Sequence, residues 1–105
     1  MAVSTIGGNT FAAGVVTVSL TPASVSAATT AEQTFTVPGV RVGDYVDVTG
    51  VTQNGVGIGQ ARVTAADTVG IRFINATAGA LTPTAGTYSF LVVRPESGTF
   101  TGFAP

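Results

Sequence analysis

Between Thr30 and Arg94, apolar residues alternate with Thr, Ser and a few charged residues, and Gly or Pro separates one alternating run from the next. A period of two is typical of β-strands that bury one face. No stretch keeps apolar residues at helical spacing for more than about two turns. The pattern therefore predicts an all-β protein.

Three strands are predicted in the first half of the chain, at residues 15–20, 32–37 and 40–49. Residues 24–28 could add a short edge strand. Pro38-Gly39 indicates a turn, and Gly43-Asp44 indicates a kink at the start of the third strand. In each strand, alternation places three residues on one face. These are Val16, Val18 and Leu20 in the first strand, Gln33, Phe35 and Val37 in the second, and Val42, Val46 and Val48 in the third.

Asn54-Gly55 is the strongest hairpin signal in the chain, because a type I′ turn needs positive φ at both central residues. A two-residue loop here predicts that the strand before it pairs with the strand after it. In that register Val48 faces Ala61, Val46 faces Val63, and Asp47 faces Arg62 on the outer side.

Residues 60–64 and 68–75 predict a second hairpin, in which opposed residues share a face. Its loop must then contain an odd number of residues, and Ala65-Ala66-Asp67 supplies one. Val63 is therefore expected opposite Val69, and Ala61 opposite Ile71. The last strand, residues 87–94, follows a loop at 76–86. It directs Tyr88, Phe90 and Val92 inward and carries Leu91 and Val93 on its other face.

The chain ends are rich in small residues and carry bulky apolar side chains. We expect an extended N-terminal arm at 1–13, one β-domain at 14–95 and a C-terminal tail at 96–105. The domain is predicted to be a small antiparallel β-sandwich or barrel, Ig-like or jelly-roll-like. Large apolar side chains on extended segments or outer faces favour docking on a neighbour. The candidate interface residues are Val3, Ile6, Phe11, Leu91, Val93, Phe100 and Phe103.

Charged residues form 9% of the 105 residues, compared with roughly 25% in an ordinary soluble domain. Two explanations remain open: partners cover much of the surface, or Thr and Ser hydroxyls solvate it. The net charge is −1, and the four Arg are scattered along the chain. They do not form the basic stripe that nucleic-acid binding requires. Each Arg is either an interface anchor or a solvated charge with a local acid.

The residue inventory argues against catalysis, cofactors and metal binding. The chain has no His, Cys, Lys or Trp, so it can form no nucleophile–His pair and no thiolate site. Asp44 and Asp47 are three residues apart on a strand and point to opposite faces, so they are not a ready acid–base pair. Asp44, Asp47 and Asp67 are too dispersed to suggest a calcium site. Residues 55–59 resemble a phosphate-binding loop but lack a following helix and a Lys.

Two further patterns bear on the compartment in which the protein works. Residues 1–10 lack the basic and apolar regions of a signal peptide, and no apolar run has the roughly 20 residues of a membrane span. We therefore expect neither a cleaved export signal nor a membrane partner. Asn75-Ala76-Thr77 matches the N-glycosylation pattern, which is interpreted as a chance match in a chain without that signal.

Two blocks, TTAEQTFTVPGVRVGDYVDV at 29–48 and ARVTAADTVGIRFINATAGALTPTAGTYSFLVVR at 61–94, together resemble a known β-sandwich module. Similar modules occur in structural proteins of tailed bacteriophages, notably capsid decoration (cement) proteins and related head-fibre bases. The resemblance implies a non-enzymatic virion protein, made in the host cytoplasm. It also implies a homotrimer that sits on the outer capsid surface and bridges major capsid proteins.

The arms and the tail lie outside this resemblance, and their expected role in capsid attachment follows from their apolar residues alone. The alternative function is a fibre module that binds a receptor or carbohydrate. Such a module needs an exposed aromatic platform, for which Tyr45 and Tyr88 are the candidates. A small hydrolase is nearly excluded by the residue inventory.

Overall fold

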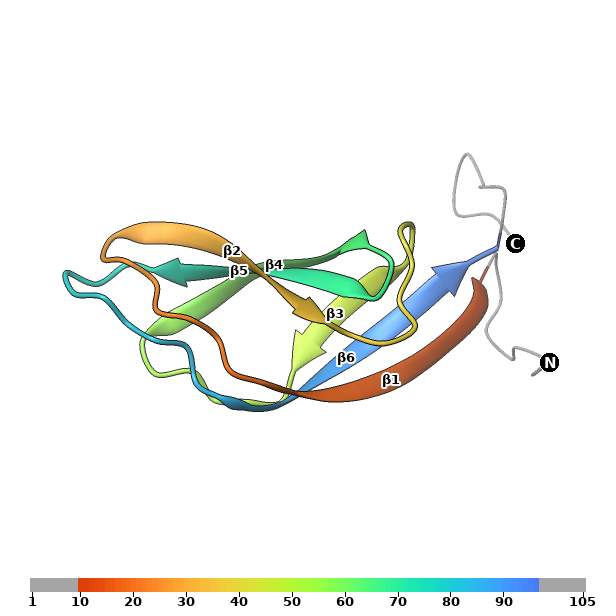
Figure 1. Ribbon diagram of the computed structural model, residues 1–105, viewed down its shortest axis with the longest axis horizontal. Coiled ribbons are helices and arrows are strands. Elements are labelled where there is room, and N and C mark those ends of the chain that lie inside the picture. The colour runs from red at the N-terminus through yellow and green to blue at the C-terminus, as the bar shows by residue number, and fades with distance from the viewer. Residues whose placement is uncertain (1–9, 97–105) are drawn as a thin grey trace.

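A computed structural model of the protein describes residues 10–96, with side chains from Ala12 onward. The described chain folds into two antiparallel three-stranded sheets that face each other (Figure 1). One sheet has the order β1-β6-β3 and the other β2-β5-β4. The strands are β1 (Thr10–Leu20), β2 (Thr29–Thr36), β3 (Tyr45–Thr49), β4 (Val56–Ala65), β5 (Thr68–Asn75) and β6 (Gly86–Pro95). The all-β prediction is confirmed, and two separate sheets make the fold a sandwich rather than a barrel.

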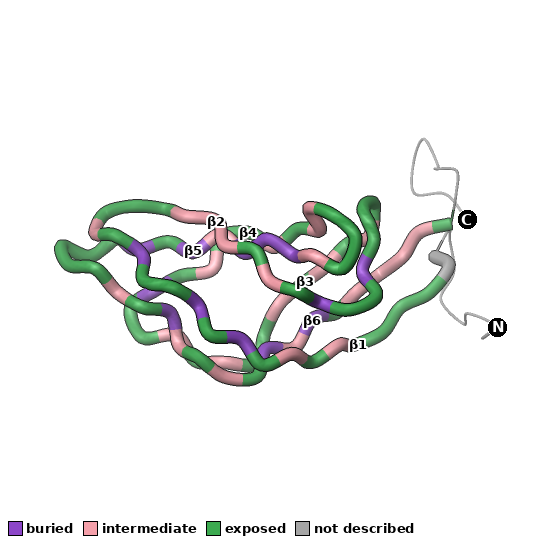
Figure 2. The backbone as a smooth tube through the Cα atoms, in the orientation of Figure 1, coloured by how far each residue is buried: buried purple, intermediate pink, exposed green. Residues whose placement is uncertain are grey.

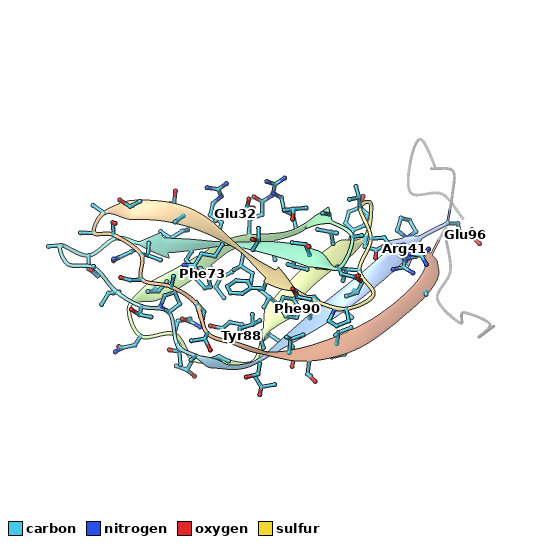
Figure 3. All side chains as sticks on the ribbon, viewed as in Figure 1. Glu32, Arg41, Phe73, Tyr88, Phe90 and Glu96 are labelled. Carbon is cyan, nitrogen blue, oxygen red and sulfur yellow. The ribbon has the colours of Figure 1, made fainter. Side chains whose placement is uncertain are left out.

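The core lies between the two sheets, where Phe73, Tyr88 and Phe90 meet (Figure 3). These three side chains are essentially inaccessible to solvent. In β5 and β6 the buried large side chains follow the predicted alternation, so the inward faces assigned to those strands are confirmed. In β2, Phe35 is partly buried and packs against the core. Val16, Val18, Val46 and Val48 also pack against the core from the other strands.

The β4–β5 hairpin has the predicted register, with Val63 opposite Val69 and Ala61 opposite Ile71. Its turn differs in detail, because Ala65 also pairs with Thr68 and the register shifts between Val63 and Ala65. The turn itself has two residues. The one extra residue that keeps the apolar faces aligned lies in β4, at the irregularity between Val63 and Ala65.

The hairpin predicted at Asn54-Gly55 is wrong. β3 pairs with β6, and β4 pairs with β5 in the other sheet. Asp47 therefore lies opposite Leu91, not Arg62. The segment between β3 and β4 crosses from one sheet to the other. Gly55 has a φ of 85°, and a Cβ there would lie 2.9 Å from Leu81 Cδ1.

Three smaller expectations also change. Val42 is in a turn and 71% exposed, so it does not share the inner face of Val46 and Val48. Residues 24–28 do not form a strand; Val25 makes an isolated bridge to Leu81. β1 begins at Thr10, so the last four residues assigned to the N-terminal arm belong to a sheet.

A buried amide fixes one end of the sandwich. Asn75 is 1% exposed, and its Nδ2 donates to the carbonyl oxygens of Val25, Ser26 and Gly79 at 2.9–3.2 Å. Its Oδ1 accepts from the backbone N–H of Thr77 at 3.0 Å. The nitrogen that glycosylation would modify is therefore enclosed and fully engaged.

Candidate interaction surface on the β1-β6-β3 sheet

The outer side of the β1-β6-β3 sheet carries rows of mostly apolar side chains. The strand register places Val15 opposite Leu91, and Leu91 opposite Asp47. The next row consists of Ala13, Val93 and Tyr45. Residues directly opposed on one side of a sheet touch across the strands. We call the surface formed by Ala13, Val15, Tyr45, Leu91 and Val93 the apolar face.

The apolar face is open to solvent in the single chain. Tyr45 is 70% exposed, Val15 66% and Leu91 47%. Thr17, Ser89 and Thr49 form the adjoining row, and Asp47 supplies the charged side chain beside Leu91. Large exposed apolar residues that adjoin one another are uncommon on a solvated sheet face and are typical of a contact surface.

Leu91 and Val93, two of the predicted interface residues, lie together on this face. Their neighbours Val15, Ala13 and Tyr45 were not among the predicted interface residues. Alternation places Val15 and Tyr45 on the side opposite the inward residues. Their closeness to Leu91 and Val93 depends on pairings between distant strands: β1 with β6 brings Val15 opposite Leu91, and β3 with β6 brings Tyr45 opposite Val93. Val3, Ile6, Phe100 and Phe103 lie outside the described residues, and for Phe11 the backbone in β1 is described but the side chain is not.

The outer side of the other sheet is different, because it is polar and charged (Figure 3). Arg62 Nε donates to Glu32 Oε2 and Arg62 Nη2 to Glu32 Oε1, both at 2.9 Å. This pair spans the middle strand at Gly70, where a Cβ would lie 2.8 Å from the Glu32 carboxylate. Hydrogen bonding from Arg62 holds the pKa of Glu32 below its ordinary value. Ile74 of β5 is the large apolar side chain exposed on this side, at 38%, so the exposed apolar side chains are gathered mainly on the β1-β6-β3 sheet.

A charged clamp fixes the loop that leads into the Tyr45 end of the apolar face. Arg94 donates to Asp44 through Nε at 2.9 Å and through Nη2 at 2.7 Å, and the Asp44 side chain is 3% exposed. Asp44 also accepts from the backbone N–H of Arg41 at 2.9 Å. The hydrogen bonds from Arg94, followed by that from Arg41, lower the pKa of Asp44 despite its burial.

The same loop is held from the opposite sheet. Asp67, in the β4–β5 turn, accepts from the backbone N–H of Gly39 at 2.8 Å, and its own N–H donates to the Val40 carbonyl at 2.9 Å. Arg94 Nη2 completes the connection by donating to the Gly39 carbonyl at 2.8 Å. The two sheets are therefore joined at this end through the loop that precedes β3.

The acids do not assemble into a reactive site. Asp44 is occupied by Arg94 and Asp67 by the loop backbone, whereas Asp47 lies on the outer side of β3. Among residues 10–96, no three His, Cys, Asp or Glu side chains are grouped as they would be around a metal ion. The described part of the chain also contains no helix that could span a bilayer.

The aromatic platform expected for a carbohydrate-binding module is incomplete. Tyr45 is exposed on the apolar face, but Tyr88 is 1% exposed in the core. The Tyr88 hydroxyl donates to the Thr84 carbonyl at 2.6 Å and accepts from Gln53 Nε2 at 2.7 Å. Tyr88 is therefore a structural residue, and the prediction that it could contribute to a platform is wrong.

A groove opens beneath β1 on the inner side of the same sheet. It has a volume of about 250 Å³ and lies between the first half of β1 and the turn at Pro38-Gly39. Ala12, Gly14 and Val16 line it from β1, and Val40 and Val92 line it from the body of the sandwich. Small residues on β1 leave this space unfilled.

Comparison of the chain with models of protein families, with curated proteins and with solved structures gave no match.

Proposed function

We propose that the protein is a non-enzymatic structural component of a bacteriophage virion. It is a capsid decoration protein that binds the outer capsid surface as a trimer and bridges major capsid proteins. The observation that carries this proposal is the apolar face, a row-by-row array of exposed apolar side chains on one sheet. The resemblance of residues 29–48 and 61–94 to decoration modules supplies the biological setting.

The apolar face is the surface through which copies of the chain meet in the proposed trimer. Aromatic residues are enriched at the centres of protein interfaces and charged residues are depleted there. The face has this composition, since Tyr45, Leu91, Val93 and Val15 adjoin one another and the acid beside them is Asp47. The opposite outer face, with the Glu32–Arg62 pair, remains in solvent.

Trimerisation supports attachment to a shell through multivalency. Three copies linked by one interface present three sets of capsid contacts, so weak individual contacts together give long retention. We assign these contacts to the N-terminal arm and the C-terminal tail.

Co-sedimentation with capsids of the phage that encodes the chain tests the function. The full chain is expected to pellet with capsids and to stay in the supernatant without them. The attachment role of the arm is tested by deleting residues 1–9. This deletion leaves β1 intact, whereas removing residues 1–13 would cut into the strand.

Absence of the full chain from the capsid pellet would contradict the decoration function. Unchanged binding after deletion of residues 1–9 would contradict the role of the arm. Binding to host cells or glycans, with none to capsids, would instead favour the fibre or receptor-binding alternative.

A further inference from the structure

The four edge strands of the sandwich are not equally protected against pairing with another chain. Exposed sheet edges expose unpaired N–H and C=O groups, and proteins usually block them with charges, short strands or irregularities. β2 carries Glu32. β3 has five residues and carries Asp47. β4 carries Arg62 and has two register irregularities.

β1 lacks all of these devices over most of its length. From Ala12 to Leu20 it pairs regularly with β6 and contains no charged residue and no Pro. Its other edge has no partner strand among the described residues (Figure 1). β3 approaches β4 across the sandwich, whereas β1 has no comparable neighbour in the second sheet. Figure 2 shows the first half of β1 as a continuous exposed stretch.

We propose that the free edge of β1 pairs with β1 of a second copy of this chain, antiparallel, about a two-fold axis at Val15. Opposed residues in a sheet share a face, so an antiparallel pair of identical strands must be centred on a residue. Leu20 is buried in its own sandwich, which confines the available edge to roughly Ala12–Ser19. Pairing centred on Val15 uses Ala12–Val18 of both copies and joins two three-stranded sheets into one sheet of six.

Side-chain sizes along β1 suit this register. On the inner side, Gly14 lies opposite the partner's Val16, and Ala12 lies opposite the partner's Val18. Each small residue of the first half therefore meets a Val of the second half. An added Cβ at Gly14 would meet no atom of the described residues within 4 Å, so the inner side of β1 has room at this position for the partner's Val16. The partner's two Val side chains would cover the groove beneath β1, which is lined by Ala12, Gly14 and Val16.

The edge contact goes beyond the proposed function, because it rests on the backbone edge of β1 and requires neither the trimer nor a capsid. On the outer side it brings Val15 against the partner's Val15 and so makes the two apolar faces continuous. It also supplies a contact between neighbouring trimers. The absence of charge on β1 removes the repulsion that identical strands would otherwise feel when paired.

Cysteine cross-linking tests the register in a chain that has no native Cys. Directly opposed residues have Cβ atoms about 4.5–5.5 Å apart, close to the span of a disulfide. Because Val15 also lies on the apolar face, the Cys variants are made in Tyr45→Lys, which places a charge on that face. In this background Val15→Cys is expected to form a covalent two-chain species under mild oxidation. Val42→Cys, at a position 71% exposed in a turn, is the matched control and is expected to remain a single chain. Ala13→Cys and Thr17→Cys should cross-link when mixed and not separately.

Cross-linking of Val15→Cys no faster than that of Val42→Cys would overturn the edge contact. A disulfide from Val16→Cys with none from Val15→Cys would overturn the register.

A charge swap separates the edge contact from the trimer. The background is Tyr45→Lys, which places a charge on the apolar face two strands away from β1. In this background the protein is expected to have the mass of two chains. In this background Val15→Lys and Val15→Glu each place like charges opposite one another, so each variant alone should have the mass of one chain. An equimolar mixture of the two should have the mass of two chains.

Circular dichroism checks that each variant is folded. A single-chain mass for the Tyr45→Lys background, or no restoration in the mixture, would overturn the proposal. A failure of the trimer proposal would instead appear as a wild-type mass that is not a multiple of three chains.

Discussion

Asp44 determines how the end of the sandwich beside the apolar face responds to acid. Its carboxylate is almost fully enclosed and accepts two N–H groups of Arg94 and one of Arg41. These donors favour the charged form, so the folded-state pKa of Asp44 lies below its ordinary value of 3.8. A lowered pKa means that folding stabilises the carboxylate relative to the carboxylic acid.

The contribution of Asp44 to stability is complete above pH 3.8 and is lost as the pH falls through the lower folded-state pKa. We predict that Asp44→Asn lowers the melting temperature at neutral pH more than Asp47→Asn does. The melting temperature of Asp44→Asn should also fall less steeply than that of the wild type below pH 3.8. Equal acid sensitivity in the two proteins would contradict this role.

Asn75 is the second residue with a large expected effect. Alanine at this position removes the amide that donates to the carbonyls of Val25, Ser26 and Gly79 and leaves the N–H of Thr77 without its side-chain acceptor. We predict that Asn75→Ala lowers the free energy of unfolding by on the order of 2 kcal/mol. This corresponds to a melting temperature lower by roughly 10 °C. Asn54→Ala, at an exposed position, is the control. A similarly small loss of stability in both variants would contradict the role of the Asn75 hydrogen bonds.

Among the elements, most strand faces could be predicted from the sequence, but only one of the four strand pairings could. Alternation identified the inward residues of β5 and β6 because each strand has one face against the core. The β4–β5 register followed because matching apolar faces allow few alignments. Asn54-Gly55 misled because a positive φ at Gly55 serves a crossover as well as a hairpin. The actual partner of β3 is β6, and no local residue pattern specifies that pairing.

The β2-β5-β4 sheet offers a test of packing across three strands. Gly70 leaves the space in which the Glu32 carboxylate passes over β5 to reach Arg62. We predict that Gly70→Ala displaces the carboxylate and raises the pKa of Glu32 towards its ordinary value of 4.5, as measured by an NMR titration. The pKa of Asp44, at the other sheet, is the internal control and should not change. An unaltered Glu32 pKa would mean that the pair does not depend on Gly70.

At the scale of the whole molecule, the two outer faces divide the surface into a charged side and an apolar side. The low fraction of charged residues left two explanations open: a surface covered by partners, or a surface solvated by hydroxyl groups. The arrangement of Val15, Leu91, Val93 and Tyr45 on one sheet favours covering by partners, because the apolar side chains are gathered rather than scattered. Leu91 and Val93 could be predicted from the outer side of β6 alone. Val15 and Tyr45 could be placed beside them only from the order of the strands in the sheet.

The most direct test of the account is the mass of the protein in solution, measured by light scattering after size exclusion. The wild type is expected to have a mass that is a multiple of three 10.4 kDa chains. Leu91→Lys places a charge at the centre of the apolar face, and its mass should no longer be a multiple of three chains. Thr34→Lys, on the exposed outer side of β2, should retain it. A wild-type mass of one or two chains, or an unchanged mass for Leu91→Lys, would contradict the claim that copies of the chain meet through the apolar face.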